Sequence, residues 1–229
     1  MQKNKDLFAK IAQQYNSWYE DPVNRCMDRQ EKAAVTDALK GTGYRANLLE
    51  VGCGTGHWTE FFLSKGFQTT GLDISDEMLR VARSKEMKSA HFIQGDAHKL
   101  PFEDETFDIC AAITLLEFVD DPRKVISQMY RVTRPGGRII MGVLNKYSIV
   151  GIRRMLKPGK TIFSDAHFFS FRELQETLSK FGRSRIMGST FCLPWEWALP
   201  YANVIEEFGR LFVPFWGTFL VGVLFKDNR

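Results

Sequence analysis

A glycine-rich turn directly after a short apolar run is the feature of this sequence that most plainly indicates chemistry. Residues 48–56 read LLEVGCGTG, so a strand-like segment carrying Glu50 leads into three closely spaced glycines, Gly52, Gly54 and Gly56. Glycines permit positive φ and let a ligand lie against bare main chain. A dinucleotide-binding turn has glycine at its first, third and sixth positions, but here the sixth position is His57. The turn therefore favours an adenosine-containing ligand and weakens the case for a pyrophosphate-linked one.

Carboxylates follow at the spacing that a nucleoside requires. Asp73 lies roughly 20 residues after the first glycine, where an acid accepts hydrogen bonds from ribose hydroxyls; the alternative is a turn aspartate that caps the next helix. Asp96 lies in a Gly-Asp-Ala segment, where it and the Ala97 amide would read the edge of an adenine ring, although Gly-Asp is also ordinary turn chemistry. Glu50 is costly inside an apolar strand unless it is paired or reaches a ligand.

The pattern around these residues predicts a sheet that brings them to one edge. Seven segments have strand character, and helical stretches separate most of them: 47–51, 68–73, 90–94, 107–114, 138–144, 184–190 and 218–225. Alternating strands and helices imply right-handed crossovers and a doubly wound α/β sheet. Ligands of such sheets bind beyond the carboxyl ends of the strands, so the glycine turn, Asp73 and Asp96 are expected to meet at one rim.

Helix signals surround the predicted sheet. Apolar residues at helical spacing from Leu7 to Tyr19 predict one amphipathic helix that ends at Asp21-Pro22, and a second helix follows from about Asn24 to Leu39. Three later helices have recognisable starts, with an N-cap at Ser75, a proline in the first turn at Pro122 and a capping box formed by Ser170 and Glu173.

Two further segments give expectations that bear on the topology. Pro135-Gly136-Gly137 predicts a turn before the fifth strand. The uncharged run from Leu211 to Phe225 is shorter than the roughly 20 apolar residues of a spanning helix, and Pro214 and Gly217 interrupt it. We therefore expect a loop followed by an edge strand.

Composition limits the class of protein. A length of 229 residues suits a single domain, and a formal net charge of +4 does not argue for a nucleic-acid partner. The four cysteines form no CxxC pair, which predicts reduced thiols in a cytoplasmic protein. The four histidines have no metal-ligand spacing, so no metal is predicted. The polar, charged start of the chain gives no secretory signal.

Taken together, these residues resemble the class I S-adenosylmethionine-dependent methyltransferases, in particular the small-molecule group that includes quinone-biosynthesis methyltransferases. The resemblance rests on five blocks in the expected order: LLEVGCGTG (48–56), GLDIS (71–75), GDAHKLPFEDETFD (95–108), LLEFVDDP (115–122) and RPGGRI (134–139). It implies a Rossmann-like, mostly parallel seven-stranded sheet with an antiparallel last strand and a helical, aromatic lid. It also implies S-adenosylmethionine as cofactor and S-adenosylhomocysteine as product.

The resemblance assigns a part of the cofactor to each block. Glu50 and the three glycines would hold the methionine end, Asp73 the ribose, and Asp96 with Ala97 the adenine. Thr114 follows the fourth strand, close to the expected position of the reactive end. Ala12-Gln13-Gln14-Tyr15-Asn16 resembles a lid segment in which a tyrosine touches the cofactor. The predicted cofactor-binding residues are Tyr15, Glu50, Gly52, Gly54, Gly56, Asp73, Ile74, Asp96, Ala97 and Thr114.

Catalysis places modest demands on the protein. The sulfonium carries an activated methyl group, so the protein mainly aligns the partners and excludes water. Phe118 stands where relatives often carry a histidine, which puts a general base there in doubt. The catalytic candidates are Tyr15, which would orient the acceptor, and His167, which would act as a base. The alternative for His167 is a loop residue that only forms hydrogen bonds.

The single domain, 1–229, divides into working parts. We expect a helical lid over 1–40, a cofactor-binding core over 47–145, and two segments, 146–169 and 191–216, that roof the acceptor. The first roof segment is rich in lysine and arginine and the second in aromatic residues, which suits a small apolar or aromatic acceptor. The alternative is that the aromatic residues pack the lid and the basic residues are solvated.

The sequence therefore predicts methyl transfer from S-adenosylmethionine to a small apolar or aromatic metabolite by a cytoplasmic monomer or homodimer. No nucleic-acid partner is expected, and contact with a membrane surface is a minor alternative. Three other functions remain open: a nucleotide-dependent oxidoreductase, a non-catalytic S-adenosylmethionine-binding module, and a methyltransferase acting on a protein or a nucleic acid.

Overall fold

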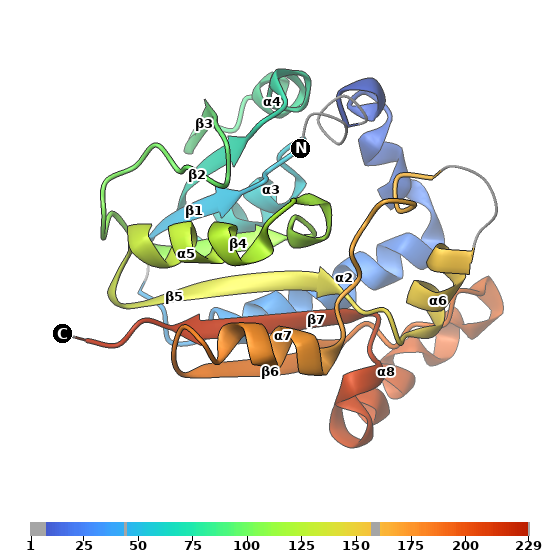
Figure 1. The fold of residues 1–229 in the computed structure, drawn as a ribbon. Coiled ribbons are helices and arrows are strands. Elements are labelled where there is room, and N and C mark those ends of the chain that lie inside the picture. The colour runs from blue at the N-terminus through green and yellow to red at the C-terminus, as the bar shows by residue number, and fades with distance from the viewer. Residues whose placement is uncertain (1–7, 44, 157–160, 229) are drawn as a thin grey trace.

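The computed structural model describes residues 8–43, 45–156 and 161–228. In this part of the chain, a seven-stranded sheet has the order β3-β2-β1-β4-β5-β7-β6 (Figure 1). Its strands are β1 (Asn47–Val51), β2 (Gln68–Asp73), β3 (Ala90–Gln94), β4 (Phe107–Ile113), β5 (Thr133–Leu144), β6 (Ser184–Ser189) and β7 (Phe219–Phe225). Strand β7 runs antiparallel to both of its neighbours, and the other strand pairs are parallel. The predicted sheet, mostly parallel with an antiparallel last strand, is confirmed.

Helices cover both faces of the sheet. In Figure 1, α5 and α7 lie in front of it and α2 and α3 behind it. The α-helices are α2 (Pro22–Ala38), α3 (His57–Ser64), α4 (Asp76–Ser84), α5 (Pro122–Val132), α6 (Ile149–Leu156), α7 (Phe171–Leu178) and α8 (Ala202–Phe212). Short 3₁₀ helices are η1 (Tyr15–Glu20), η2 (Leu116–Phe118), η3 (Glu196–Tyr201) and η4 (Pro214–Trp216).

The predicted helix starts are present. The Ser75 hydroxyl accepts a hydrogen bond from the Met78 amide, and Pro122 is the first residue of α5. Ser170 and Glu173 form the reciprocal capping box at the start of α7. Each device satisfies amides that the first helical turn leaves without partners, which fixes where the chain leaves the sheet.

Two apolar layers hold the sheet between the helices. On one face, the cluster includes Ile126 and Met129 of α5 and Leu174 and Leu178 of α7. On the other face, it includes Val35 of α2 and Phe61 and Phe62 of α3. The inner strands β1, β4 and β7 are buried on both sides, as a sheet covered by helices requires, whereas the edge strands β3 and β6 are partly exposed. All four cysteines are buried free thiols.

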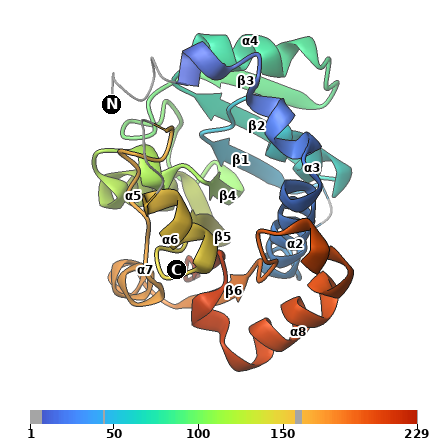
Figure 2. The ribbon, with the colours of Figure 1, turned by 90° about the vertical axis from the view of Figure 1, so that its right-hand side faces the viewer.

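The parallel strands end together at one rim, toward which Figure 2 looks. The register pairs Val51 with Leu72 and Asp73 with Gln94, so β1, β2 and β3 finish side by side. The segment 8–20 leads past this rim into α2 (Figure 2). Because each strand terminates here, the residues that immediately follow the strands gather into one region.

The opening helix predicted from Leu7 to Tyr19 is wrong as a single element. Leu7 lies outside the described residues, residues 8–11 are helical, 12–14 form a turn, and η1 follows. The Ser17 hydroxyl bonds to the Gln14 carbonyl oxygen at 2.7 Å, and the Asn16 side chain is bound elsewhere, to Thr55. Polar side chains therefore compete with a regular helix here, and contacts with the rim override the apolar periodicity.

Two topological expectations are also corrected. Pro135-Gly136-Gly137 lies within β5 as an irregularity between the Phe107–Thr133 and Ile109–Arg138 pairs, and does not form a turn before the strand. The last strand is not at an edge: β7 lies between β5 and β6, and six of its seven residues are buried. A continuous apolar run such as Phe219–Phe225 suits an inner strand better than an edge. Strand β6 takes the edge position.

Candidate active site

The glycine turn after β1 has the left-handed backbone that its sequence predicts. Gly52, Gly54 and Gly56 have φ values of +76°, +51° and +78°. A side chain at Gly52 would meet Leu115 at 2.6 Å, whereas nothing lies within 4 Å of the corresponding position at Gly54. Gly54 therefore opens onto free space, and only a residue without Cβ adopts this path without strain.

The carboxylate of Asp73 organises the rim between β1 and β2. Its two oxygens accept hydrogen bonds from the Gly54 amide at 2.8 Å and the Ser75 amide at 2.9 Å. Burial raises the pKa of Asp73, although these amides oppose the shift. Each oxygen retains a further lone pair, so the carboxylate is held in place and still has capacity to accept from a ligand.

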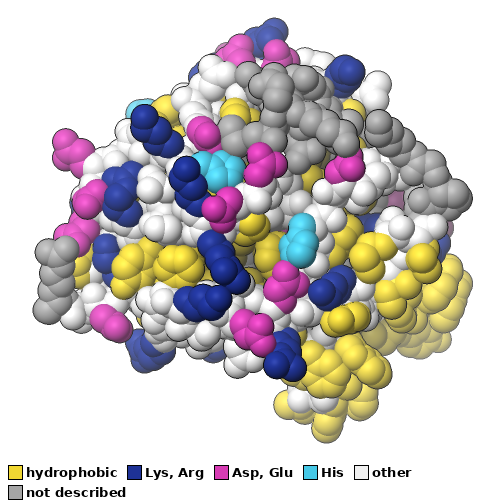
Figure 3. Space-filling view, viewed as in Figure 1, with side chains coloured by type: hydrophobic (Ala, Val, Ile, Leu, Met, Phe, Trp, Pro, Cys, Tyr) yellow, Lys and Arg dark blue, Asp and Glu magenta, His cyan; other side chains and the backbone are white. Residues whose placement is uncertain are grey.

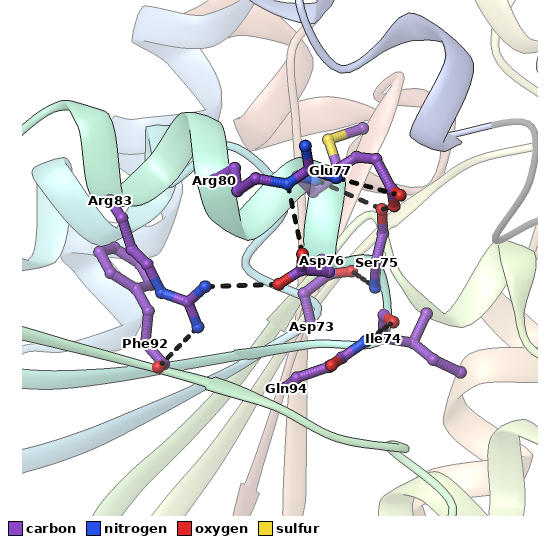
Figure 4. Close-up of polar contacts among 10 residues, drawn as sticks. Asp73, Ile74, Ser75, Asp76, Glu77, Arg80, Arg83, Phe92 and Gln94 are labelled. Carbon is purple, nitrogen blue, oxygen red and sulfur yellow. Dashed lines mark hydrogen bonds and ion pairs between the residues drawn. The ribbon is translucent and has the colours of Figure 1, made fainter.

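The loop after β2 is fixed from its outer side as well (Figure 4). Gln94 on β3 donates to the Ile74 carbonyl oxygen at 3.1 Å. The carboxylate of Asp76, the first residue of α4, forms ion pairs with the guanidinium groups of Arg80 and Arg83 at 3.2 and 3.4 Å. The Gln94 bond joins this loop to β3, whereas the Asp76 ion pairs lie within α4 and do not touch the Asp73 carboxylate.

Asp96 and Ala97 follow β3 at the same rim. The Asp96 carboxylate accepts from the His98 amide at 2.8 Å and lies 2.9 Å from His98 Nδ1. It therefore fulfils the turn role that its sequence allowed, while both Asp96 and Ala97 also line the cavity described below.

Glu50 is buried within β1, with only 2% of its surface exposed. Thr59 of α3 donates a hydrogen bond to its carboxyl group, and burial raises the pKa of Glu50 to about 8. One hydroxyl is a small compensation for a buried carboxylate, so the group is predominantly neutral near pH 7.

Thr114 and Tyr15 lie where the strand rim meets the opening segment. Thr114 has φ +49°, an uncommon conformation for a β-branched residue, and strained backbone of this kind concentrates at functional sites. Burial raises the pKa of Tyr15 to about 12, so its hydroxyl remains a neutral donor and acceptor. Thr55 donates to Asn16 Oδ1 at 2.8 Å, which ties the opening segment to the glycine turn.

A cavity joins these groups. All the predicted cofactor-binding residues except Gly56 line it. Gly56 instead serves packing, because a Cβ there would meet Met87 at 2.8 Å. Among the described residues that line the cavity are three acids, Glu50, Asp73 and Asp96, but no lysine or arginine. This charge pattern suits a cationic nucleoside and opposes a pyrophosphate.

His167 lies apart from this cavity. Its ring Nε2 is 2.5 Å from Glu173 Oε1, and 54% of the side chain is exposed. Its amide donates to the Glu117 carbonyl oxygen, which places its backbone, and not its ring, next to η2. His167 lines neither this cavity nor the neighbouring one that Arg154 and Phe163 line, so its catalytic role stays a prediction.

Sequence reasoning missed several aromatic lining residues. Those absent from our prediction include Phe8, Tyr19, Trp58 and Phe118. Tyr19 stacks on His57 with ring centroids 3.6 Å apart, and His57 bonds to Asp28 at 2.7 Å. In the sequence, the spacing of these aromatic residues resembles ordinary core packing. The path of the opening segment is what brings Phe8 and Tyr19 to the rim.

The expected roof over 191–216 is not placed over this cavity. Its large side chains are exposed on the end of the molecule that α8 forms (Figure 3), and within the described structure none of them lines the cavity: Trp195, Trp197, Tyr201, Phe208, Phe212, Phe215 and Trp216. Helix α8 packs through Gly209 and Glu206, so its apolar side chains point outward. The segment 146–169 does reach the site region, through Arg154 and Phe163.

Comparison with known proteins decides the family. Residues 49–141 match the model of a methyltransferase domain. A protein of Methanocaldococcus jannaschii is 34% identical over 79% of this chain and 82% of its own length. The demethylmenaquinone methyltransferase of Bacillus mycoides is 30% identical over 77% of this chain and 79% of that protein. The chain belongs to the class I S-adenosylmethionine-dependent methyltransferases.

The methyltransferase fold agrees with this assignment. A solved S-adenosylmethionine-dependent methyltransferase of Thermotoga maritima superposes with a TM-score of 0.76 at 24% identity, covering 97% of this chain and 99% of that one. S-adenosylmethionine is the cofactor of the family, and the acidic cavity at the strand rim fits its positive charge. In the part of this methyltransferase that the structure describes, no helix is long and apolar enough to cross a membrane.

Proposed function

We propose that this methyltransferase transfers the methyl group of S-adenosylmethionine to a small apolar or aromatic metabolite. The observation that carries the proposal is a second cavity, of about 370 Å³, which shares Tyr15, Trp58 and Thr114 with the first. Aromatic side chains form much of its lining. A small cavity with aromatic walls and a few polar groups beside the cofactor cavity suits a small molecule better than a macromolecule.

In this proposal, each part of the rim holds one part of the cofactor. Glu50, Gly52 and Gly54 face the methionine end, and Asp73 accepts from the ribose hydroxyls. Asp96, Ala97 and Ile74 border the adenine. When bound, the cofactor supplies an activated methyl group, so the remaining work of the protein is alignment and exclusion of water.

Tyr15 and Thr114 are proposed to orient the acceptor. Both line the first and the second cavity, so they stand between the two ligands. Because the pKa of Tyr15 is raised, its hydroxyl acts as a neutral hydrogen-bonding group and not as the base. Gly56 supports the turn by packing, and a base at His167 would require the loop that carries it to approach the cavity.

The acidic lining also bears on the rival functions. A dinucleotide-dependent oxidoreductase must hold a pyrophosphate, which three acids and no nearby lysine or arginine in the described lining would repel. The relative named for demethylmenaquinone supports a small aromatic acceptor. A monomer or homodimer without a nucleic-acid partner is part of the same proposal.

The proposal is tested with S-adenosylmethionine labelled in its methyl group. The full chain is incubated with a cell extract divided into metabolite, protein and nucleic-acid fractions. We expect S-adenosylhomocysteine to form only with the metabolite fraction, and the label to appear there. Label in protein or nucleic acid would contradict the proposal, and tight cofactor binding without turnover in any fraction would favour a non-catalytic binding module.

A further inference from the structure

Three charged side chains line the second cavity: Asp21, Glu31 and Arg154. Asp21 is the N-cap of α2 and accepts a hydrogen bond from the Asn24 amide at 2.9 Å, so its carboxylate already has a structural role. The cavity lies between the opening segment, α2 and α6, and Glu31 and Arg154 have not been given a role. Neither of these two residues lines the cofactor cavity. The remaining walls are largely aromatic, and include Trp18, Phe118 and Phe163.

Glu31 occupies a core position of α2. It lies in the buried stripe with Met27, Ala34 and Val35, and only 7% of its surface is exposed. Its carboxyl group forms no hydrogen bond with any residue that the structure describes. A buried polar group without a partner is costly, so a carboxyl kept at such a position points to a ligand that satisfies it.

Arg154 approaches the same space from α6. Its guanidinium stacks on Phe163 at 4.8 Å and forms no hydrogen bond within the described structure. Charge interactions with Glu31, Glu117 and Tyr15 reach it, but its planar fork of five N–H donors is unfilled. Such a fork binds carboxylate or phenolate oxygens, and its stacking on an aromatic ring fixes its direction.

We propose that the methyl acceptor binds in this cavity through an acidic oxygen, a phenol or a carboxylic acid carried on a planar apolar frame. The Arg154 guanidinium donates a hydrogen bond to that oxygen, and the protonated Glu31 carboxyl donates a second one. The aromatic side chains of the walls pack against the planar part of the acceptor. This inference rests on the proposed function and names the substrate class of the same site. A cationic amine would meet the Glu31 carboxyl but would be repelled by Arg154.

The groups that face Glu31 determine how the site depends on pH. The pKa of Glu31 is raised to about 8, chiefly by burial and also by Asp28 and Glu117, against the opposing charges of Arg154 and Lys32. Glu31 is therefore mainly protonated at neutral pH, and its carboxyl donates a hydrogen bond to a bound anion. Binding of an anionic ligand is expected to weaken as pH rises through 8, and E31Q should remove this dependence.

The test is calorimetric titration of the full chain saturated with S-adenosylhomocysteine. The probes are benzoate and phenol, with benzylamine as the cationic counterpart of similar shape. We expect benzoate or phenol to bind and benzylamine not to. R154M should weaken that binding by at least about tenfold, the scale of a lost charge-assisted hydrogen bond. R153M is the matched control, because Arg153 neighbours it on α6 but is exposed and lies over Trp195.

Each outcome decides the inference. Binding of benzylamine alone, equal effects of R154M and R153M, or no binding of either oxygen probe would overturn it. The affinity for S-adenosylhomocysteine reports separately on folding and on the cofactor cavity, and it should be unchanged in both variants. If wild-type protein fails to bind S-adenosylhomocysteine, the proposed function fails first; if it binds and only the acceptor probes fail, the inference alone is wrong.

Discussion

At the scale of single residues, buried acids dominate the chemistry of this protein. Glu50 and Asp73 line the cofactor cavity, while Glu31 lines the second one. Desolvation raises the pKa of all three. A protein that keeps carboxyl groups in such positions gives up stability for binding, because the same groups would be more stable in water.

Glu50 gives a prediction about protons. A neutral carboxyl with a pKa of about 8 should ionise when a cationic ligand arrives, since opposite charge favours the charged form. We expect S-adenosylmethionine to release a proton on binding near pH 7, measurable by calorimetry in buffers of different ionisation enthalpy. S-adenosylhomocysteine, without the sulfonium charge, should release less. E50Q should abolish the difference between the two ligands; an unchanged difference would remove Glu50 from the methionine end.

At the scale of elements, α8 is attached to the sheet by polar contacts and presents apolar residues to solvent. The Glu206 carboxylate accepts from the Ser189 hydroxyl at 3.0 Å and from the Thr190 and Phe191 amides at 3.2 and 2.8 Å. It satisfies backbone groups that leave the end of β6. We therefore expect the attachment of α8 to the sheet to depend strongly on the single side chain of Glu206, although the helix is rich in apolar residues.

E206A should lower the free energy of unfolding by about 2–4 kcal/mol, because it leaves the Thr190 and Phe191 amides without their acceptor. The Ser189 hydroxyl keeps the Gln30 carbonyl oxygen as an acceptor at 3.1 Å. Urea unfolding measures the change. E207A is the control, since Glu207 is the exposed neighbour on the same helix and should have little effect. Equal losses in the two variants would show that Glu206 does not anchor α8.

The elements were predictable where local pattern and tertiary packing agree. The bounds of β1, β2 and β3 follow from apolar runs between turn residues, and the caps at Ser75 and Ser170 follow from residue type. The opening segment was not predictable, because Asn16 bonds to a turn about 40 residues away. Glu31 could have been found, since an acid in the apolar stripe of α2 is itself a signal.

At the scale of the whole molecule, the buried acids set the pH dependence of stability. Burial raises the pKa of Glu31 and Glu50 to about 8 and that of Glu117 to about 7. A carboxyl whose folded pKa is raised holds its proton more tightly when folded, so stability falls as pH rises from the unfolded pKa through the folded one. Asp28 and Asp37 have lowered pKa values, and their contribution is lost only in more acidic solution.

The protein without ligand should therefore be most stable near pH 5 and lose stability toward pH 8. Each ionising group contributes at most about 1.4 kcal/mol per pH unit. Urea unfolding at several pH values measures the slope, and E31Q should make it shallower. Stability that rises between pH 5 and 8 would contradict the assignment of these groups as buried acids.

The central claim is that the acidic rim beyond β1, β2 and β3 binds S-adenosylmethionine, with Asp73 on the ribose. Calorimetric titration of S-adenosylhomocysteine into wild-type protein and D73A tests it most directly, with D76A as control, because Asp76 bonds to arginines of α4 and does not line the cavity. We expect D73A to weaken binding by about 1–3 kcal/mol, roughly 5- to 150-fold, and D76A to leave it unchanged. Undiminished affinity in D73A, or no binding to the wild type, would contradict the account.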